Sequence, residues 1–119
     1  MTSFKQGDIV IVEYPFSERT GSKKRPAFVV SNDSYHHSRQ DVIVAGITSN
    51  VARKLTGDTL LENWQQAGLN YPSLVTGILQ TVKSYMVTRS LGVVSHQDLQ
   101  RILDNLQAVI KIEKPALGA

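Results

Sequence analysis

The chain has 119 residues and no cysteine, which leaves room for one packed domain over residues 1–119 and excludes disulfides and cysteine-ligated zinc sites. Lysine and arginine exceed the acids by three, and no apolar run reaches the roughly 20 residues that cross a membrane. Composition therefore predicts a soluble, cytoplasmic, single-domain protein with no membrane contact, whose mild positive charge permits a polyanionic partner. The excess charge is concentrated in one segment without acids, which carries Arg19, Lys23, Lys24 and Arg25.

The first half of the chain predicts short strands separated by polar segments. β-Branched, apolar runs bounded by turn residues favour strands buried on both faces. Three segments have this character: residues 8–14, 26–30 and 41–48. Pro26 begins the second of them, which suits a strand edge. We expect residues 16–24 to form a long loop, residues 31–34 a turn, and Gly46 a bend or a close backbone approach.

The second half predicts weaker strands and then a helix. The strand candidates are residues 59–62, 74–76 and 79–88. We expect residues 63–72 to be irregular and Gly77 to form a bulge. Apolar residues at helical spacing over residues 99–110 predict an amphipathic helix, with Ser95 as its N-cap and Asp98 in its first turn.

These elements predict a mainly β fold with a C-terminal helix, in the form of a small, partly open antiparallel β-barrel. No familiar metal-ligand or cofactor-binding spacing is present, so no metal and no cofactor are expected. His36 and His37 are neighbours whose side chains point apart, which argues against a metal that both would share.

Arg25 is the first candidate site residue, because it lies where the basic loop meets a strand. A guanidinium held by a sheet can bind a phosphate through two hydrogen bonds, although a solvated surface arginine fits the position as well. Lys23 and Lys24 would add attraction for phosphates or are ordinary surface lysines.

Polar residues at a strand end form the second candidate. Thr48, Ser49 and Asn50 follow a buried strand and could direct hydrogen-bonding groups into a cleft. The same residues also suit an ordinary strand-to-turn transition. Glu18 could accept a proton or neutralise Arg19. The residues alone therefore indicate a nucleic-acid binder or a phosphodiester enzyme.

Trp64 lies in the irregular segment and allows two interpretations. An exposed tryptophan can stack on a nucleic-acid base. A lone tryptophan more commonly pins a loop onto the core, and we favour that role here.

Several sequence blocks, in their order and spacing, resemble the MazF/PemK-like endoribonuclease toxins. The specific parts are Lys-Arg-Pro within residues 24–33 and Ile-Thr-Ser within residues 41–50. Gly-Asp-Ile-Val at residues 7–10, Asn-Trp-Gln-Gln-Ala-Gly-Leu at residues 63–69 and Pro-Ser-Leu-Val at residues 72–75 add support. The resemblance covers nearly the whole chain.

The resemblance implies an SH3-like barrel of the PemK/MazF/CcdB type that forms a symmetric homodimer. It implies metal-independent, sequence-specific cleavage of single-stranded RNA, and a cognate antitoxin whose extended segment fills the RNA site. Carried over residue by residue, it makes Arg25 and Thr48 catalytic. The residues expected to contact RNA are Lys23, Lys24, Ser49, Asn50, Glu18 and Thr76.

One departure from the family pattern concerns the catalytic acid. Some members carry Arg-x-Asp-Gln after the Pro-Ser block, whereas residues 76–80 here read Thr-Gly-Ile-Leu-Gln. Glu18 and His36 are the candidates to replace the acid. The alternative function is a catalytically weak or inactive RNA- or protein-binding module on the same barrel. A third is an interaction protein that uses its C-terminal helix.

Overall fold

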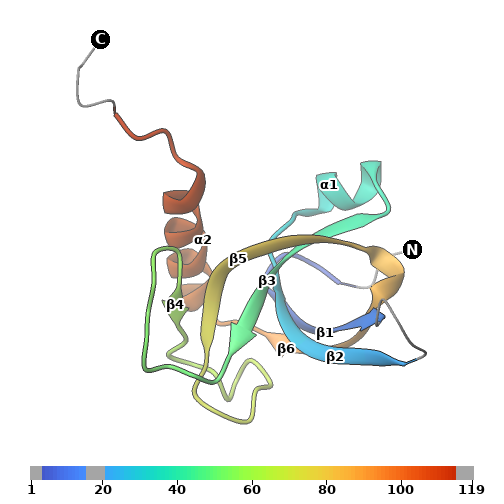
Figure 1. The fold of residues 1–119 in the computed structure, drawn as a ribbon, viewed down its shortest axis with the longest axis horizontal. Helices are drawn as coiled ribbons and strands as arrows, with labels where there is room; N and C mark the ends of the chain where they lie inside the picture. The colour runs from blue at the N-terminus through green and yellow to red at the C-terminus, as the bar shows by residue number, and fades with distance from the viewer. Residues whose placement is uncertain (1–3, 16–20, 115–119) are drawn as a thin grey trace.

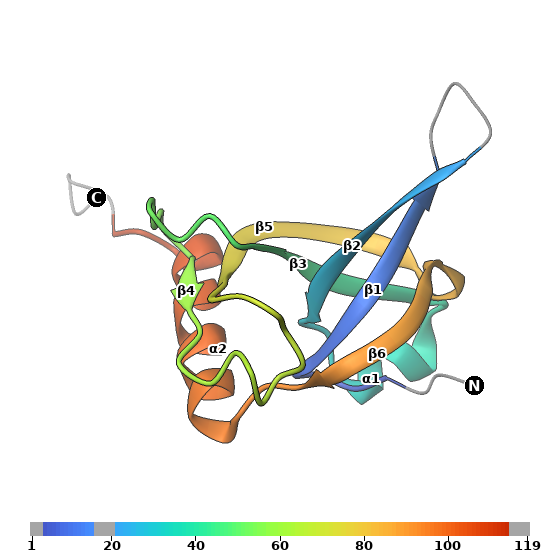
Figure 2. The same ribbon diagram turned by 90° about the horizontal axis from the view of Figure 1, so that it is seen from below.

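The computed structural model describes residues 4–15 and 21–114, which form one curved sheet and two α-helices. The strands are β1 (Asp8–Pro15), β2 (Ser22–Val29), β3 (Asp41–Thr48), β4 (Thr59–Leu60), β5 (Leu74–Lys83) and β6 (Val87–Val93). The helices are α1 (Asp33–Ser38), the short 3₁₀ helix η1 (Ser84–Met86) and α2 (His96–Ile110). Figures 1 and 2 show α2 beside β4 at one end of the molecule and α1 at the other.

The six strands form one sheet in the order β4-β5-β3-β2-β1-β6, and all of its strand pairs are antiparallel. The sheet bends into a half-barrel, and α2 packs beside it (Figure 1). The predicted fold class, a small antiparallel barrel with a C-terminal helix, is therefore confirmed.

Both faces of the central strands are buried, as the apolar runs predicted. Alternate residues enter different clusters, because successive side chains in a strand point to opposite faces. Ile9 and Phe28 join the cluster that includes Ile102 of α2. Val10 and Val29 join a second cluster on the other face. This arrangement explains why β1 lacks the alternation of a half-exposed strand.

Strand β2 begins at Ser22, so the expected loop over residues 16–24 was wrong over its last three residues. The extra residues are exposed or half-buried, and hydrophobicity could not reveal them. They are strand because they pair with β1, for example Lys24 with Glu13. Pro26 consequently lies inside the strand, one residue before the ladder with β3 starts at Ala27.

Helix α1 was not predicted, since residues 31–34 were assigned to a turn. Its N-cap Asn32 accepts a hydrogen bond from the Tyr35 N–H at 3.1 Å. The capping side chain was visible in the sequence. A helix of six residues, however, is too short to show an apolar periodicity.

The segment predicted as one strand over residues 79–88 is divided by η1. The Ser84 N–H donates to the Gln40 carbonyl at 2.9 Å, and this contact accompanies the turn from β5 into β6. The predicted strand at residues 74–76 and the first part of the one predicted at 79–88 are instead one continuous strand, β5. The β3–β5 register shifts between Ala45 and Ile47, which confirms an irregularity at Gly46.

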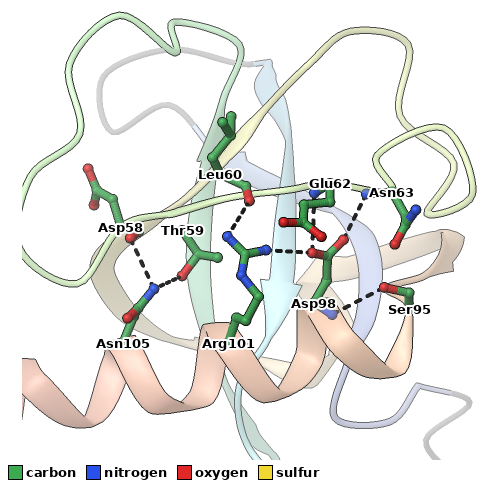
Figure 3. A network of polar contacts seen from close by, with 9 residues as sticks. All are labelled: Asp58, Thr59, Leu60, Glu62, Asn63, Ser95, Asp98, Arg101 and Asn105. Carbon is green, nitrogen blue, oxygen red and sulfur yellow. Dashed lines mark hydrogen bonds and ion pairs between the residues drawn. The ribbon is translucent and has the colours of Figure 1, made fainter.

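Helix α2 begins as predicted, because the Ser95 hydroxyl accepts the Asp98 N–H at 3.1 Å. Asp98 is fully buried, and its carboxylate bonds groups outside the first turn of the helix as well (Figure 3). Its carboxylate accepts the Glu62 N–H at 3.2 Å and the Asn63 N–H at 2.9 Å, and pairs with Arg101 at 2.7 Å.

Further contacts along α2 extend this network (Figure 3). Arg101 also donates to the Leu60 carbonyl at 3.1 Å, and Asn105 donates to the Thr59 hydroxyl at 2.7 Å. The helix therefore holds β4 and the start of the segment 61–73. None of the helices within the described part of the chain is long and apolar enough to span a membrane.

Candidate functional site

A pocket of about 510 Å³ brings together the two predicted catalytic residues, Arg25 of β2 and Thr48 of β3. We call it the Arg25 pocket. Its remaining polar side chains are Ser49, Asn70, Tyr71, Ser73 and Arg89. None of the described residues that line it is acidic. The pocket therefore presents cations and hydrogen-bonding groups suited to an anionic ligand.

The sheet register explains why Arg25 and Thr48 meet. Strands β2 and β3 pair with Ala27 opposite Gly46, and the ladder between them ends there. Continuing the same antiparallel register by two residues brings Arg25 alongside Thr48. Thr48 is the last residue of β3, and Arg25 lies in the middle of β2, just before the part of that strand that is buried in the core.

The Thr48 hydroxyl is oriented by the chain that follows it. Its oxygen accepts the Asn50 N–H at 3.1 Å, and the Asn50 side chain accepts the Ala52 N–H at 3.3 Å. Both are local side-chain turns of the kind that compete with a continuing strand. Within the described residues the Thr48 hydroxyl hydrogen has no acceptor, so it can be donated to a ligand.

Two other predicted RNA contacts lie in an adjacent pocket of about 570 Å³, which shares Thr48. They are Asn50 and Thr76. The Thr76 hydroxyl donates to the Gly46 carbonyl at 2.8 Å and accepts the Ile78 N–H at 3.2 Å. Its polar atoms are therefore engaged by the irregularity between β3 and β5.

The remaining basic candidates lie farther along β2. Lys23 and Lys24 are exposed and pair in register with Tyr14 and Glu13, outside the lining of the Arg25 pocket. Glu18, predicted as an RNA contact and as a replacement acid, lies outside the described residues.

His36 does not lie in the Arg25 pocket, so its proposed part as the replacement acid is corrected. It lines a separate pocket of about 960 Å³ between α1 and residues 84–87. Its Nε2 lies 2.7 Å from the Ser31 hydroxyl, whereas its buried Nδ1 has no hydrogen-bond partner in the part of the chain that the structure describes. Burial lowers the pKa of His36 below its ordinary value.

The lowered pKa of His36 predicts a pH-dependent stability. Below about pH 6.5, His36 is protonated to a greater extent in the unfolded chain than in the folded chain. The free energy of unfolding should therefore fall as the pH decreases. His36→Gln should flatten this slope in urea unfolding between pH 7.5 and pH 5. His96→Gln provides the control, because His96 is exposed in α2 and does not line the pocket of His36, so the wild-type slope should remain. Equal slopes for wild type and His36→Gln would contradict the prediction.

Several pocket residues were missed by sequence reasoning. Arg89 comes from β6, and Tyr71 from the irregular segment between β4 and β5. The predicted stacking residue of that segment, Trp64, is half-buried and packs against the core. Trp64 therefore pins the loop, as favoured above, and Tyr71 is the exposed aromatic residue of the pocket. The exposure of each could not be read from the sequence.

No group of three metal-ligating side chains occurs among the residues that the structure describes. His36 and His37 are adjacent residues of α1. Both line the same pocket beside α1, together with Asp33 and Arg39.

Comparisons with known proteins agree with this fold. The toxin MazF-mt6 of Mycobacterium tuberculosis is 21% identical, with a TM-score of 0.68 and coverage of 87% of this chain and 98% of that chain. A mycobacterial endoribonuclease in complex with its cognate antitoxin is 15% identical, with a TM-score of 0.72 and coverage of 95% and 100%.

MazF in a MazE–MazF structure from Deinococcus radiodurans is 14% identical, with a TM-score of 0.74 and coverage of 92% of this chain and 98% of that chain. A search of curated protein sequences gives no significant match. The family of PemK-like and MazF-like toxins matches residues 5–110, which is most of the chain. The protein therefore belongs to this family of toxins of type II toxin–antitoxin systems.

Proposed function

We propose that this toxin is an endoribonuclease that cuts single-stranded RNA at short sequences in the Arg25 pocket. The observation that carries the proposal is the meeting of Arg25 and Thr48 in one pocket of a chain from this toxin family. Similar structures include endoribonucleases, which supports the same activity here.

In the proposed reaction the RNA 2′-oxygen attacks the adjacent phosphorus, and the 5′-oxygen of the next nucleotide leaves. The products are a cyclic 2′,3′-phosphate and a free 5′-hydroxyl. Negative charge grows on the non-bridging phosphate oxygens in the transition state, where Arg25 supplies two N–H donors and a positive charge. Thr48 donates its hydroxyl hydrogen to the same phosphate. This hydrogen is available because the Asn50 N–H uses only the hydroxyl oxygen, as an acceptor. The reaction also requires a proton acceptor for the 2′-hydroxyl and a proton donor for the leaving 5′-oxygen.

We further propose that the toxin acts in the cytoplasm as a homodimer and is inhibited by a cognate antitoxin. Similar toxins have been seen with an antitoxin, namely a mycobacterial endoribonuclease and the MazF of Deinococcus radiodurans. An extended antitoxin segment that fills the Arg25 pocket would exclude RNA from it. Lys23, Lys24, Ser49, Asn50, Thr76 and Glu18 stay predicted RNA contacts.

Cleavage of a long single-stranded RNA by the purified toxin tests the proposed activity. Primer extension should show stops at a few short sequences after incubation in EDTA. A matched substrate with 2′-O-methyl groups should stay intact, because its 2′-oxygen cannot attack. Intact RNA in every arm would exclude the nuclease, and salt-sensitive binding without cleavage would favour the alternative of an inactive binding module.

A further inference from the structure

The sheet brings a second arginine to the Arg25 pocket. Ile11 of β1 pairs with Pro26 of β2 on one side and with Arg89 of β6 on the other. The three residues therefore lie in one row across neighbouring strands, with Arg89 and Pro26 about 10 Å apart at their Cα atoms. Arg25 precedes Pro26 in β2, and Arg25 and Arg89 both line the pocket.

The charges of these arginines are not balanced by nearby acids. Both are exposed, and neither takes part in the ion pairs of the described residues, which join Lys83 to Asp41 and Arg101 to Asp98. The described lining of the pocket contains no acid. Two like charges beside one cavity repel each other, and an anionic ligand between them offsets this repulsion. Such a pair favours a ligand with more than one negative charge.

An aromatic side chain stands beside the two cations. Tyr71 is 67% exposed, although it lines the same pocket. Its backbone is held in place, because the Ser73 hydroxyl donates to the Tyr71 carbonyl at 2.8 Å. Exposed aromatic rings next to cations are the usual means by which proteins bind the bases of single-stranded nucleic acids.

A backbone contact holds the segment with Tyr71 against the strand with Arg89. Gly68 has φ +89° and lies so close to the Leu91 carbonyl of β6 that a Cβ atom would overlap it. Gly92 likewise leaves no room for a Cβ beside the Ala67 carbonyl. Tyr71 and Arg89 are thus carried by two segments packed backbone to backbone.

We propose that Arg89 and Tyr71 form a nucleotide subsite beside the cleavage position. Arg89 binds the phosphate that neighbours the scissile one, and Tyr71 stacks on the attached base. Arg89 does not contact the reacting phosphate, so it contributes to substrate binding and leaves the chemical step to Arg25 and Thr48. The identity of the ligand as single-stranded RNA rests on the proposed function.

The test measures affinity for an uncleavable 2′-O-methyl RNA at several salt concentrations. Arg89→Ala should weaken binding about tenfold at low salt and reduce the slope of log affinity against log salt by about 0.7, because one phosphate contact is lost. Arg89→Lys should restore the slope. Arg39→Ala is the matched control. Arg39 lies over the Tyr35 ring and lines the pocket beside α1, so its removal should leave the slope unchanged.

Variants of Tyr71 test the stacking role separately. Tyr71→Ala should weaken binding on the order of tenfold at every salt concentration, with an unchanged slope, whereas Tyr71→Phe should bind like wild type. If Arg89→Ala weakens binding but Tyr71→Ala does not, the pocket contacts the phosphate alone, and the nucleotide subsite is overturned. Both positions are exposed, and circular dichroism confirms that each variant is folded.

Cleavable RNA separates the two proposals. If the wild type cuts RNA, Arg89→Ala should raise KM about tenfold with kcat nearly unchanged. Unchanged KM and unchanged salt slope would overturn the subsite and leave the nuclease in place. If the wild type binds the uncleavable RNA through Arg89 and Tyr71 but cuts no RNA, the nuclease fails and the subsite stands.

Discussion

Arg25→Ala should reduce the rate of RNA cleavage by on the order of a hundredfold or more, with little change in stability. Arg25 lines the same pocket as Thr48, on the neighbouring strand of the sheet. Removing it leaves the charge of the transition state without its main electrostatic partner. The side chain is exposed, so its loss costs the core nothing. Single-turnover cleavage of a labelled single-stranded RNA measures the effect.

Two further variants sharpen this experiment. Arg25→Lys keeps the charge but loses the two-pronged hydrogen bond, and it should fall between wild type and Arg25→Ala. Arg39→Ala removes the same charge outside the pocket and should cleave at the wild-type rate. A loss of only a few-fold in Arg25→Ala would remove Arg25 from the catalytic group.

Asp98→Ala should lower the free energy of unfolding by about 3 kcal/mol or more. The carboxylate is fully buried and accepts three hydrogen bonds, from Arg101 and from the N–H groups of Glu62 and Asn63. Its removal leaves two backbone donors without their acceptor and Arg101 without its partner. Urea unfolding followed by circular dichroism measures the change.

The same helix supplies a matched control. Asp104 is exposed, and among the described residues its side chain accepts only the Gln100 side chain, at 3.2 Å. Asp104→Ala should therefore change the free energy of unfolding by less than about 0.5 kcal/mol. Similar losses for Asp98→Ala and Asp104→Ala would show that the buried network does not stabilise the fold.

Strands with apolar side chains on both faces could be predicted because their own residues form β-branched, apolar runs bounded by turn residues. The segments predicted at 8–14 and 41–48 correspond to β1 and β3, and Ser95 caps α2 as expected. The start of β2 could not be predicted, since Lys23 and Lys24 are strand residues only through their pairing with β1. Short α1 carried too few residues to show a period.

The same distinction applies to the residues of the candidate site. Arg25 and Thr48 could be proposed because sequence motifs identify them, and the structure places both in one pocket. Arg89 and Tyr71 could not, because their position depends on the pairing of β6 with β1 and on the docking of residues 63–72. Asp98 was assigned to the helix start alone, since its backbone partners lie 35 and 36 residues away.

The close contact between Gly68 and β6 has a consequence for how this toxin can diversify. Backbone atoms make the contact and Leu69 packs against the core, so the side chains of Asn70 and Tyr71 are not needed to attach the segment to the sheet. Asn70 and Tyr71 are exposed at the pocket and can be exchanged without loosening its wall. The exposed pocket residues are thereby separated from the contact that fixes the backbone, so substitutions at Asn70 and Tyr71 should change what the pocket binds without altering the fold.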